Sequence, residues 1–85
     1  MKSFKISVST PEGSVYNEEG RYLSAPGIEG FFGIMADHAP FISELLPGKI
    51  TITDKSEEKT VIVSKGKGFL EVSKNKVTVL LDSVQ

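Results

Sequence analysis

The alternation of apolar and polar residues constrains the fold of this chain more than any other feature. Phe4, Ile6 and Val8 alternate with polar residues, and Val77 and Val79 repeat the pattern further along the chain. A period of two places successive side chains on opposite faces of a strand, so one face is buried and the other meets solvent. No long stretch keeps the three- and four-residue spacing of apolar positions that a helix needs. The pattern therefore predicts strands throughout.

Glycine, proline and short polar runs divide these segments. Turn-forming residues occur at 11–13, 17–20, 26–27, 47–48, 54–58, 65–68 and 73–76, and Asn75 suits a left-handed position. The segments between them predict strands at 4–8, 15–16, 21–25, 31–35, 41–46, 49–53, 60–63, 69–72 and 77–81. About ten short strands at this spacing favour an all-β fold, an antiparallel β-sandwich or flattened barrel of two sheets.

The length and the alternation together predict one β-sandwich domain over residues 1–85, with a modest core and neither linker nor repeat. The core side chains are expected at one phase of each strand. They are Phe4, Ile6, Val8, Leu23, Ile34, Ile50, Ile52, Val61, Val63, Leu70, Val72, Val77 and Val79.

Composition excludes several classes of protein. Without cysteine, neither a disulfide framework nor a cysteine-containing zinc site can form. The chain has no apolar run near the roughly 18 residues of a membrane span, and no apolar segment of a secretory signal follows Met1. The net charge is −1, and the lysines at 65, 67, 74 and 76 lie in predicted turns. Nucleic acid is therefore not an expected partner.

Residues 27–48 form the most unusual segment. Gly27, Gly30 and Gly33 recur every three residues around Phe31 and Phe32, and the only histidine, His38, follows. The spacing is not the G-x-G-x-x-G of dinucleotide-binding proteins, because no helix is expected after it. A metal centre needs three or four converging ligands, and a catalytic triad needs an activated nucleophile. Neither is visible, so we expect no catalytic residue, no metal and no cofactor.

The same segment resembles the epsilon subunit of F-type ATP synthase. The resemblance rests on the run from Gly33 to Phe41, which contains His38-Ala39-Pro40, and on Leu46-Pro47-Gly48. Ala36 stands where that family usually has proline. The matching positions further along are Gly66, Gly68, Phe69, Glu71, Val72, Val77, Thr78, Val79, Leu80 and Asp82, and the resemblance covers essentially all 85 residues.

The resemblance implies a non-catalytic subunit of the central stalk, or rotor, of a proton- or sodium-translocating ATP synthase. Its partners would be the gamma subunit and the ring of c subunits. It would lie peripherally on the cytoplasmic face of a bacterial inner membrane. The resemblance maps the gamma-subunit interface onto Thr10, His38 and Ser43, and the c-ring interface onto Glu29, Gly30, Phe31 and Phe32.

The resemblance also bears on ATP. In that family a carboxyl-terminal helical hairpin restrains hydrolysis and contributes the ATP-binding residues. The hairpin would begin at Gln85, so we expect neither the inhibitory arm nor tight ATP binding among these residues.

Two other functions are compatible with a small all-β chain. One is a stand-alone β-sandwich module that binds a peptide or a sugar, although the chain has no Trp and only two Tyr for ring stacking. The other is an oligonucleotide-binding barrel, which needs aromatic and basic residues interleaved on one sheet. Here the segment between Arg21 and Lys49 holds Phe31, Phe32 and Phe41 and no lysine or arginine. The sequence alone also leaves open which of Phe31 and Phe32 faces a partner.

Overall fold

The computed structural model describes residues 2–85, and these residues form eight strands and no helix; Met1 lies outside them. The strands are β1 (Phe4–Thr10), β2 (Gly13–Gly27), β3 (Gly30–Met35), β4 (Phe41–Leu45), β5 (Gly48–Asp54), β6 (Lys59–Ser64), β7 (Gly68–Ser73) and β8 (Lys76–Leu81). The all-β prediction is confirmed, with eight strands in place of about ten.

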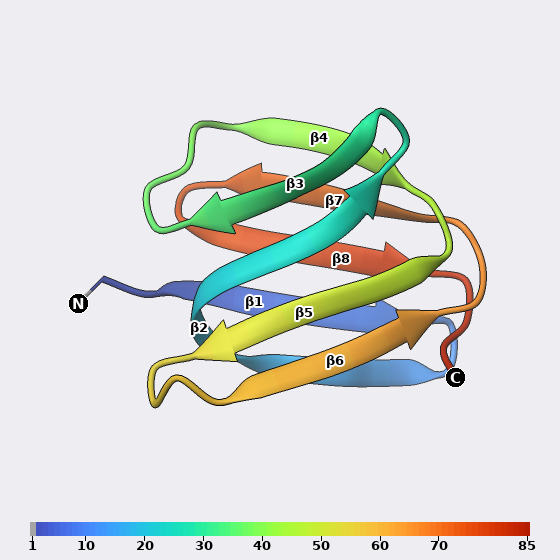
Figure 1. Cartoon of the computed structure of the whole chain (residues 1–85), viewed down its shortest axis with the longest axis horizontal. Helices are drawn as coiled ribbons and strands as arrows, with labels where there is room; N and C mark the ends of the chain where they lie inside the picture. Colours follow the sequence, from blue (N-terminus) through green and yellow to red (C-terminus); the bar gives the residue numbers. More distant parts are fainter. Residues whose placement is uncertain (1) are drawn as a thin grey trace.

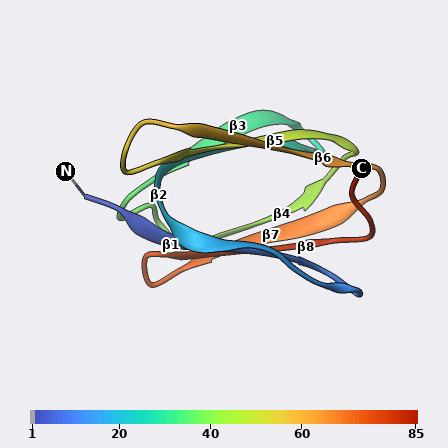
Figure 2. The same ribbon diagram turned by 90° about the horizontal axis from the view of Figure 1, so that it is seen from below.

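The strands form two layers that face each other across the core (Figures 1 and 2). One layer contains β4, β7, β8, β1 and the first half of β2, and the other contains β3, the second half of β2, β5 and β6. Hydrogen bonds connect the strands into one continuous sheet in place of two separate ones. Every pair is antiparallel except β1 with β8, which is parallel. The alternation in the sequence could not reveal that pair, because it joins the two ends of the chain.

Strand β2 passes from one layer to the other, which explains the lower strand count. Its first half pairs with β1, and its second half lies between β3 and β5. Gly20 sits at the crossing, where an added Cβ would lie 2.7 Å from the Ile6 side chain and 3.1 Å from the Thr53 carbonyl oxygen. The predicted stops at 17–20 and 26–27 therefore lie within one bent strand.

The core follows the predicted phase in every strand but one. The buried apolar side chains are Phe4, Ile6, Val8, Leu23, Ala25, Ile34, Leu45, Ile50, Ile52, Ile62, Leu70, Val72, Val77, Val79 and Leu81. In β6 the prediction of Val61 and Val63 is wrong, because Ile62 and Ser64 face inward while Val61 is 52% exposed. The buried Ser64 hydroxyl donates a hydrogen bond to the Gly66 carbonyl oxygen (2.8 Å), which satisfies its polar group.

The β7–β8 turn has the conformation predicted for Asn75. Lys74 and Asn75 both have positive φ, at 53° and 59°. Two successive left-handed residues are typical of the tightest antiparallel hairpins. The turn brings Asn75 close to the beginning of β1, where Lys5 N–H approaches the Asn75 carbonyl oxygen (3.4 Å).

Candidate protein-binding surfaces

The β2–β3 hairpin turns through Ile28 and Glu29, with Gly27 paired to Gly30. Gly30 has a φ of 129°, which L side chains rarely adopt. At Gly27 an added Cβ would lie 2.7 Å from the Phe32 ring and 2.9 Å from the Gly30 carbonyl oxygen. The two glycines are therefore required for a hairpin this tight.

Backbone hydrogen bonds hold the hairpin against the opposite layer. Ile28 N–H donates to the Glu44 carbonyl oxygen (3.0 Å), and Leu46 N–H donates to the Pro26 carbonyl oxygen (2.9 Å). Both bonds join the hairpin to β4 or the residue after it, so the turn is fixed at two points. The candidate ring-contacting residues therefore sit on a supported element.

Phe31 and Phe32 point in opposite directions, as successive residues of a strand do. Phe31 is 69% exposed. Phe32 is half-buried against the core, and its ring meets the Phe41 ring edge-on at a centroid distance of 5.1 Å. Phe31 is thus the free aromatic side chain of the pair.

A groove of about 460 Å³ lies between the hairpin and β4. Its lining residues are Gly27, Ile28, Glu29, Gly30, Phe31, Phe32, Phe41, Ile42, Ser43 and Glu44. All four predicted ring-contacting residues and Ser43 therefore meet at one place. The lining residues carry two carboxylates, three phenyl rings and no cationic group, so the groove suits a basic side chain.

The three residues mapped to the gamma subunit do not form one cluster. His38 lies in the β3–β4 loop, where its ring is edge-on to Phe41 at 5.7 Å and its Nδ1 is 2.7 Å from the Ala39 carbonyl oxygen. Ser43 lies on β4, paired with Leu70. Thr10 ends β1, at the other end of the sandwich from the β3–β4 loop (Figure 1). Strands β8 and β7 lie between β1 and β4 in the same layer, so they separate Thr10 from Ser43.

An exposed apolar patch lies on the outer face of that layer, and the sequence analysis missed it. We call Ile42, Phe69 and Leu80 the outer patch; these side chains are 70%, 56% and 54% exposed. Phe69 and Leu80 are directly paired across β7 and β8, and all three side chains line one shallow depression. The sequence did contain a signal for this patch. Each of the strands β4, β7 and β8 has one large apolar residue at a position that alternates with its core residues.

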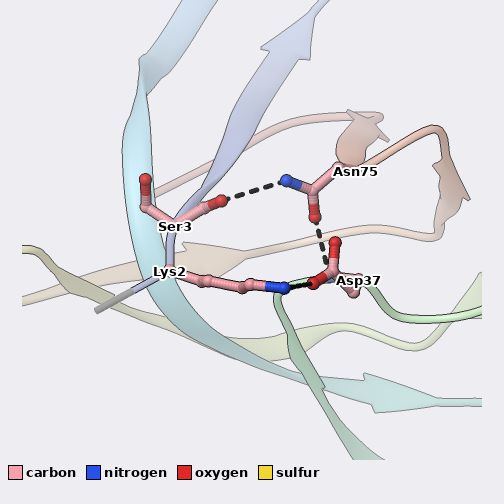
Figure 3. A network of polar contacts seen from close by, with 4 residues as sticks. All are labelled: Lys2, Ser3, Asp37 and Asn75. Carbon is pink, nitrogen blue, oxygen red and sulfur yellow. Dashed lines mark hydrogen bonds and ion pairs between the residues drawn. The ribbon is translucent and has the colours of Figure 1, made fainter.

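Polar contacts cluster around the beginning of β1. Lys2 Nζ lies 2.7 Å from Asp37 Oδ2, and this neighbour raises the pKa of Lys2 above its usual 10.5. The Ser3 hydroxyl donates to Glu19 Oε1 (2.6 Å). That bond, together with Lys55, holds the pKa of Glu19 below its ordinary 4.5. Asn75 completes the cluster by bonding to Ser3 and Asp37 (Figure 3).

Within residues 2–85, no group of three or more His, Asp or Glu side chains is placed to hold a metal ion. The same residues include no helix of a length and hydropathy that could span a membrane. The features that stand out among them are surfaces suited to contact with another molecule: the groove, the outer patch and the loop that holds His38.

Curated relatives match the chain over nearly its whole length. An ATP synthase epsilon chain of Nitratidesulfovibrio vulgaris is 43% identical over 84 residues, which are 99% of this chain and 61% of that protein. The sodium-ion-specific ATP synthase epsilon chain of Propionigenium modestum is 42% identical over 82 residues, or 96% of this chain and 58% of that protein. The chain thus spans about three fifths of the length of these relatives.

Solved structures share the fold at lower identity. A chain in the cryo-EM structure of the Euglena gracilis mitochondrial ATP synthase, comprising OSCP, F1 and c-ring, has a TM-score of 0.91 at 18% identity. The match covers 98% of this chain and 52% of that one. A chain of the Tetrahymena thermophila mitochondrial ATP synthase central stalk and c-ring has a TM-score of 0.83 at 19% identity, covering 99% and 66%.

The family model of the β-sandwich domain of the ATP synthase delta/epsilon chain matches residues 3–85. This match and the identity to curated epsilon chains agree with the resemblance seen in the segment from Gly33 to Gly48. The chain therefore belongs to the ATP synthase delta/epsilon family, whose β-sandwich domain it contains.

Proposed function

We propose that this chain serves as a central-stalk subunit of an F-type ATP synthase and joins the gamma subunit to the c-ring. The observation that carries the proposal is the outer patch, in which three large apolar side chains are exposed together on one sheet. Apolar side chains gathered in this way mark a surface that a protein partner covers. Family membership supports the choice of partner.

The gamma subunit docks on the outer face of β1, β8, β7 and β4. In the order β1-β8-β7-β4, Thr10 and Ser43 lie on the two outermost strands, and the outer patch extends from β8 to β4. Ser43 pairs with the buried Leu70, so its side chain lies on the inner side of β4, beside the groove. His38 adds a half-buried ring in the loop before the beginning of β4. The outer patch forms the apolar centre of this face, and the central side chains of an interface carry most of its binding free energy.

The c-ring docks at the β2–β3 hairpin. Glu29 and Glu44 supply negative charge, and Phe31 supplies an exposed ring beside Gly30 at the mouth of the groove. A basic residue on a partner loop would pair with the carboxylates and lie against the aromatic faces. The hairpin's hydrogen bonds to the opposite layer then transmit force from this contact into the sandwich.

In this role the chain couples rotation of the ring to the gamma subunit and catalyses no reaction itself. The coupling ion is a proton or a sodium ion, and one similar relative is described as sodium-ion specific. The complex holds the chain on the cytoplasmic face of a bacterial inner membrane. Calorimetric titration with ATP is expected to give no saturable binding at micromolar concentration.

The proposal is tested by titrating the chain with purified gamma subunit from the same organism, and separately with a glycan panel and a peptide library. We expect saturable one-to-one binding to the gamma subunit. His38→Ala should weaken it, while Thr60→Ala, at an exposed position of β6 in the other layer, should not. Absence of gamma binding together with saturable binding of a sugar or peptide would instead establish a stand-alone binding module.

A further inference from the structure

Asn75 joins three segments that are far apart in the sequence (Figure 3). Its side-chain Oδ1 accepts a hydrogen bond from Asp37 N–H (2.7 Å), and its Nδ2 donates to the Ser3 carbonyl oxygen (3.0 Å). Both ends of the amide are therefore used, one as acceptor and one as donor. The Asn amide carries its acceptor and its donors on two separate atoms, which is what these two bonds require.

The turn itself does not require these two bonds. Lys74 and Asn75 have left-handed φ values, and glycine adopts that conformation without cost. The hairpin between β7 and β8 is closed by the pairing of Ser73 with Lys76. The Asn75 side chain is therefore free to act outside its own hairpin, on the β3–β4 loop and on the residues before β1.

The bond to Asp37 acts on a left-handed backbone position. Asp37 has a φ of 64°, in a region that glycine adopts freely and that Asp and Asn adopt more readily than other residues. The bond from Asp37 N–H to Asn75 and the ion pair between Asp37 and Lys2 both favour this conformation. Asp37 directly precedes His38, so its backbone direction sets where the His38 ring lies.

Ring contacts continue from His38 into the groove. The His38 ring meets Phe41 edge-on at 5.7 Å, and Phe41 meets Phe32 edge-on at 5.1 Å. Phe32 and Phe41 both line the groove beside Ser43. A continuous series of contacts therefore runs from Asn75 through the β3–β4 loop to the candidate docking surfaces.

We propose that Asn75 is a positioning residue, whose side-chain amide holds the β3–β4 loop in the conformation that presents His38 and packs Phe41 against Phe32. Fixing the loop before binding removes the entropic cost of ordering it in the complex. The consequence for docking rests on the proposed function, whereas the positioning of the loop does not.

Three variants separate the amide from the turn. Asn75→Gly removes the side chain and keeps the left-handed conformation. Asn75→Asp keeps an acceptor for Asp37 N–H and loses the donor to the Ser3 carbonyl oxygen, so it should retain part of the loop conformation. It replaces Asn75→Gly as the test variant if the glycine variant folds poorly. Lys74→Gly is the matched control, because it loosens the adjacent left-handed position of the same turn and leaves the amide in place.

The first measurement is nuclear magnetic resonance of the free chain. In Asn75→Gly we expect the exchange of the Asp37 amide proton to accelerate roughly tenfold, as loss of one hydrogen bond predicts. The ring proton signals of His38 and Phe41 should shift, and those of Phe31 should not. Asn75→Asp should retain part of the protection at Asp37, and Lys74→Gly should retain all of it. Unchanged exchange and ring signals in Asn75→Gly would overturn the positioning role.

The second measurement is titration with the purified gamma subunit. We expect Asn75→Gly to weaken binding roughly three- to tenfold and Lys74→Gly to leave it unchanged. Shifted ring signals with unchanged gamma affinity would overturn the docking consequence. If the unsubstituted chain fails to bind gamma, the proposed function fails, and the resonance experiment alone decides whether Asn75 positions the loop.

Discussion

Phe31 and Phe32 show how the position of a single residue within a strand decides whether its side chain meets solvent or packs on the core. The two residues have the same side chain and are adjacent, but β3 places Phe31 toward solvent and Phe32 against Phe41. The resemblance to epsilon subunits maps the c-ring interface onto both of these residues. The sequence could not decide which of the two rings is exposed. The face on which each ring lies depends on the register of the β2–β3 hairpin.

The same substitution at the two positions should have opposite effects. Phe31→Ser should change the free energy of unfolding by no more than about 0.5 kcal/mol, as for an exposed position. Phe32→Ser should destabilise by about 2–4 kcal/mol, because it removes a ring that packs on the core. Urea unfolding measures both, and c-ring association per folded molecule should fall only for Phe31→Ser. Equal destabilisation by both variants would contradict the assigned directions.

The hydrogen bond from Ser3 to Glu19 predicts a pH effect. The folded-state pKa of Glu19 lies below 4.5, so its contribution to stability is present above the unfolded-state value and is lost as pH falls through the folded one. Ser3→Ala should raise the pKa of Glu19 toward its ordinary value. The variant should therefore be slightly less stable at neutral pH, and the difference should shrink as the pH falls below about 4.5. Carboxyl resonance titration of Glu19 checks the shift, and an unchanged pKa would show that the charges of Lys55 and Lys5 lower it without the Ser3 hydroxyl.

At the scale of elements, the sequence-based predictions were wrong for the extent of β2 and for the buried face of β6, for different reasons. The polar run from Asn17 to Gly20 resembles a turn, but it belongs to the first half of β2, which pairs with β1 at the edge of its layer. Most side chains there are exposed, so this part of the strand needs few apolar residues. In β6 the apolar run offers two phases, and only the pairing with β5 selects the one that buries Ile62. Strands with strict alternation, such as β7 and β8, were predicted correctly.

Adjacent truncations in β6 test this phase directly. Ile62→Ala should destabilise by about 2–5 kcal/mol, because it leaves a cavity in the core. Val61→Ala should change the free energy of unfolding by about 0.5 kcal/mol or less, because that side chain meets solvent. Chemical denaturation of the two variants provides the comparison, and a larger loss at Val61 would show that the strand has the opposite phase.

At the scale of the whole molecule, the topology creates surfaces that no single segment contains. The outer patch combines β4, β7 and β8, which are neighbours in the sheet although a hairpin, β5–β6, separates β4 from β7 in the sequence. The cluster around Asn75 similarly joins the beginning of the chain, the β3–β4 loop and the β7–β8 turn. Sequence periodicity predicts which side chains of a strand are exposed to solvent, but the order of the strands in the sheet decides which exposed side chains become neighbours.

Docking of the gamma subunit on the outer patch is tested most directly by a matched pair of double variants. Phe69→Ser with Leu80→Ser removes the two patch side chains that are paired across β7 and β8. Met35→Ser with Val61→Ser removes comparably exposed apolar side chains from the outer face of the other layer. Both proteins should keep the fold, as judged by thermal melts.

The deciding measurement is the dissociation constant of each double variant for the purified gamma subunit, determined by calorimetric titration against the unsubstituted chain. Hot-spot side chains at the centre of an interface contribute about 2 kcal/mol or more, so loss of Phe69 and Leu80 should weaken binding roughly thirtyfold. The variant of the other layer should bind as the unsubstituted chain does. If Phe69→Ser with Leu80→Ser binds normally and the other double variant does not, the gamma subunit docks on the opposite face and the account is wrong.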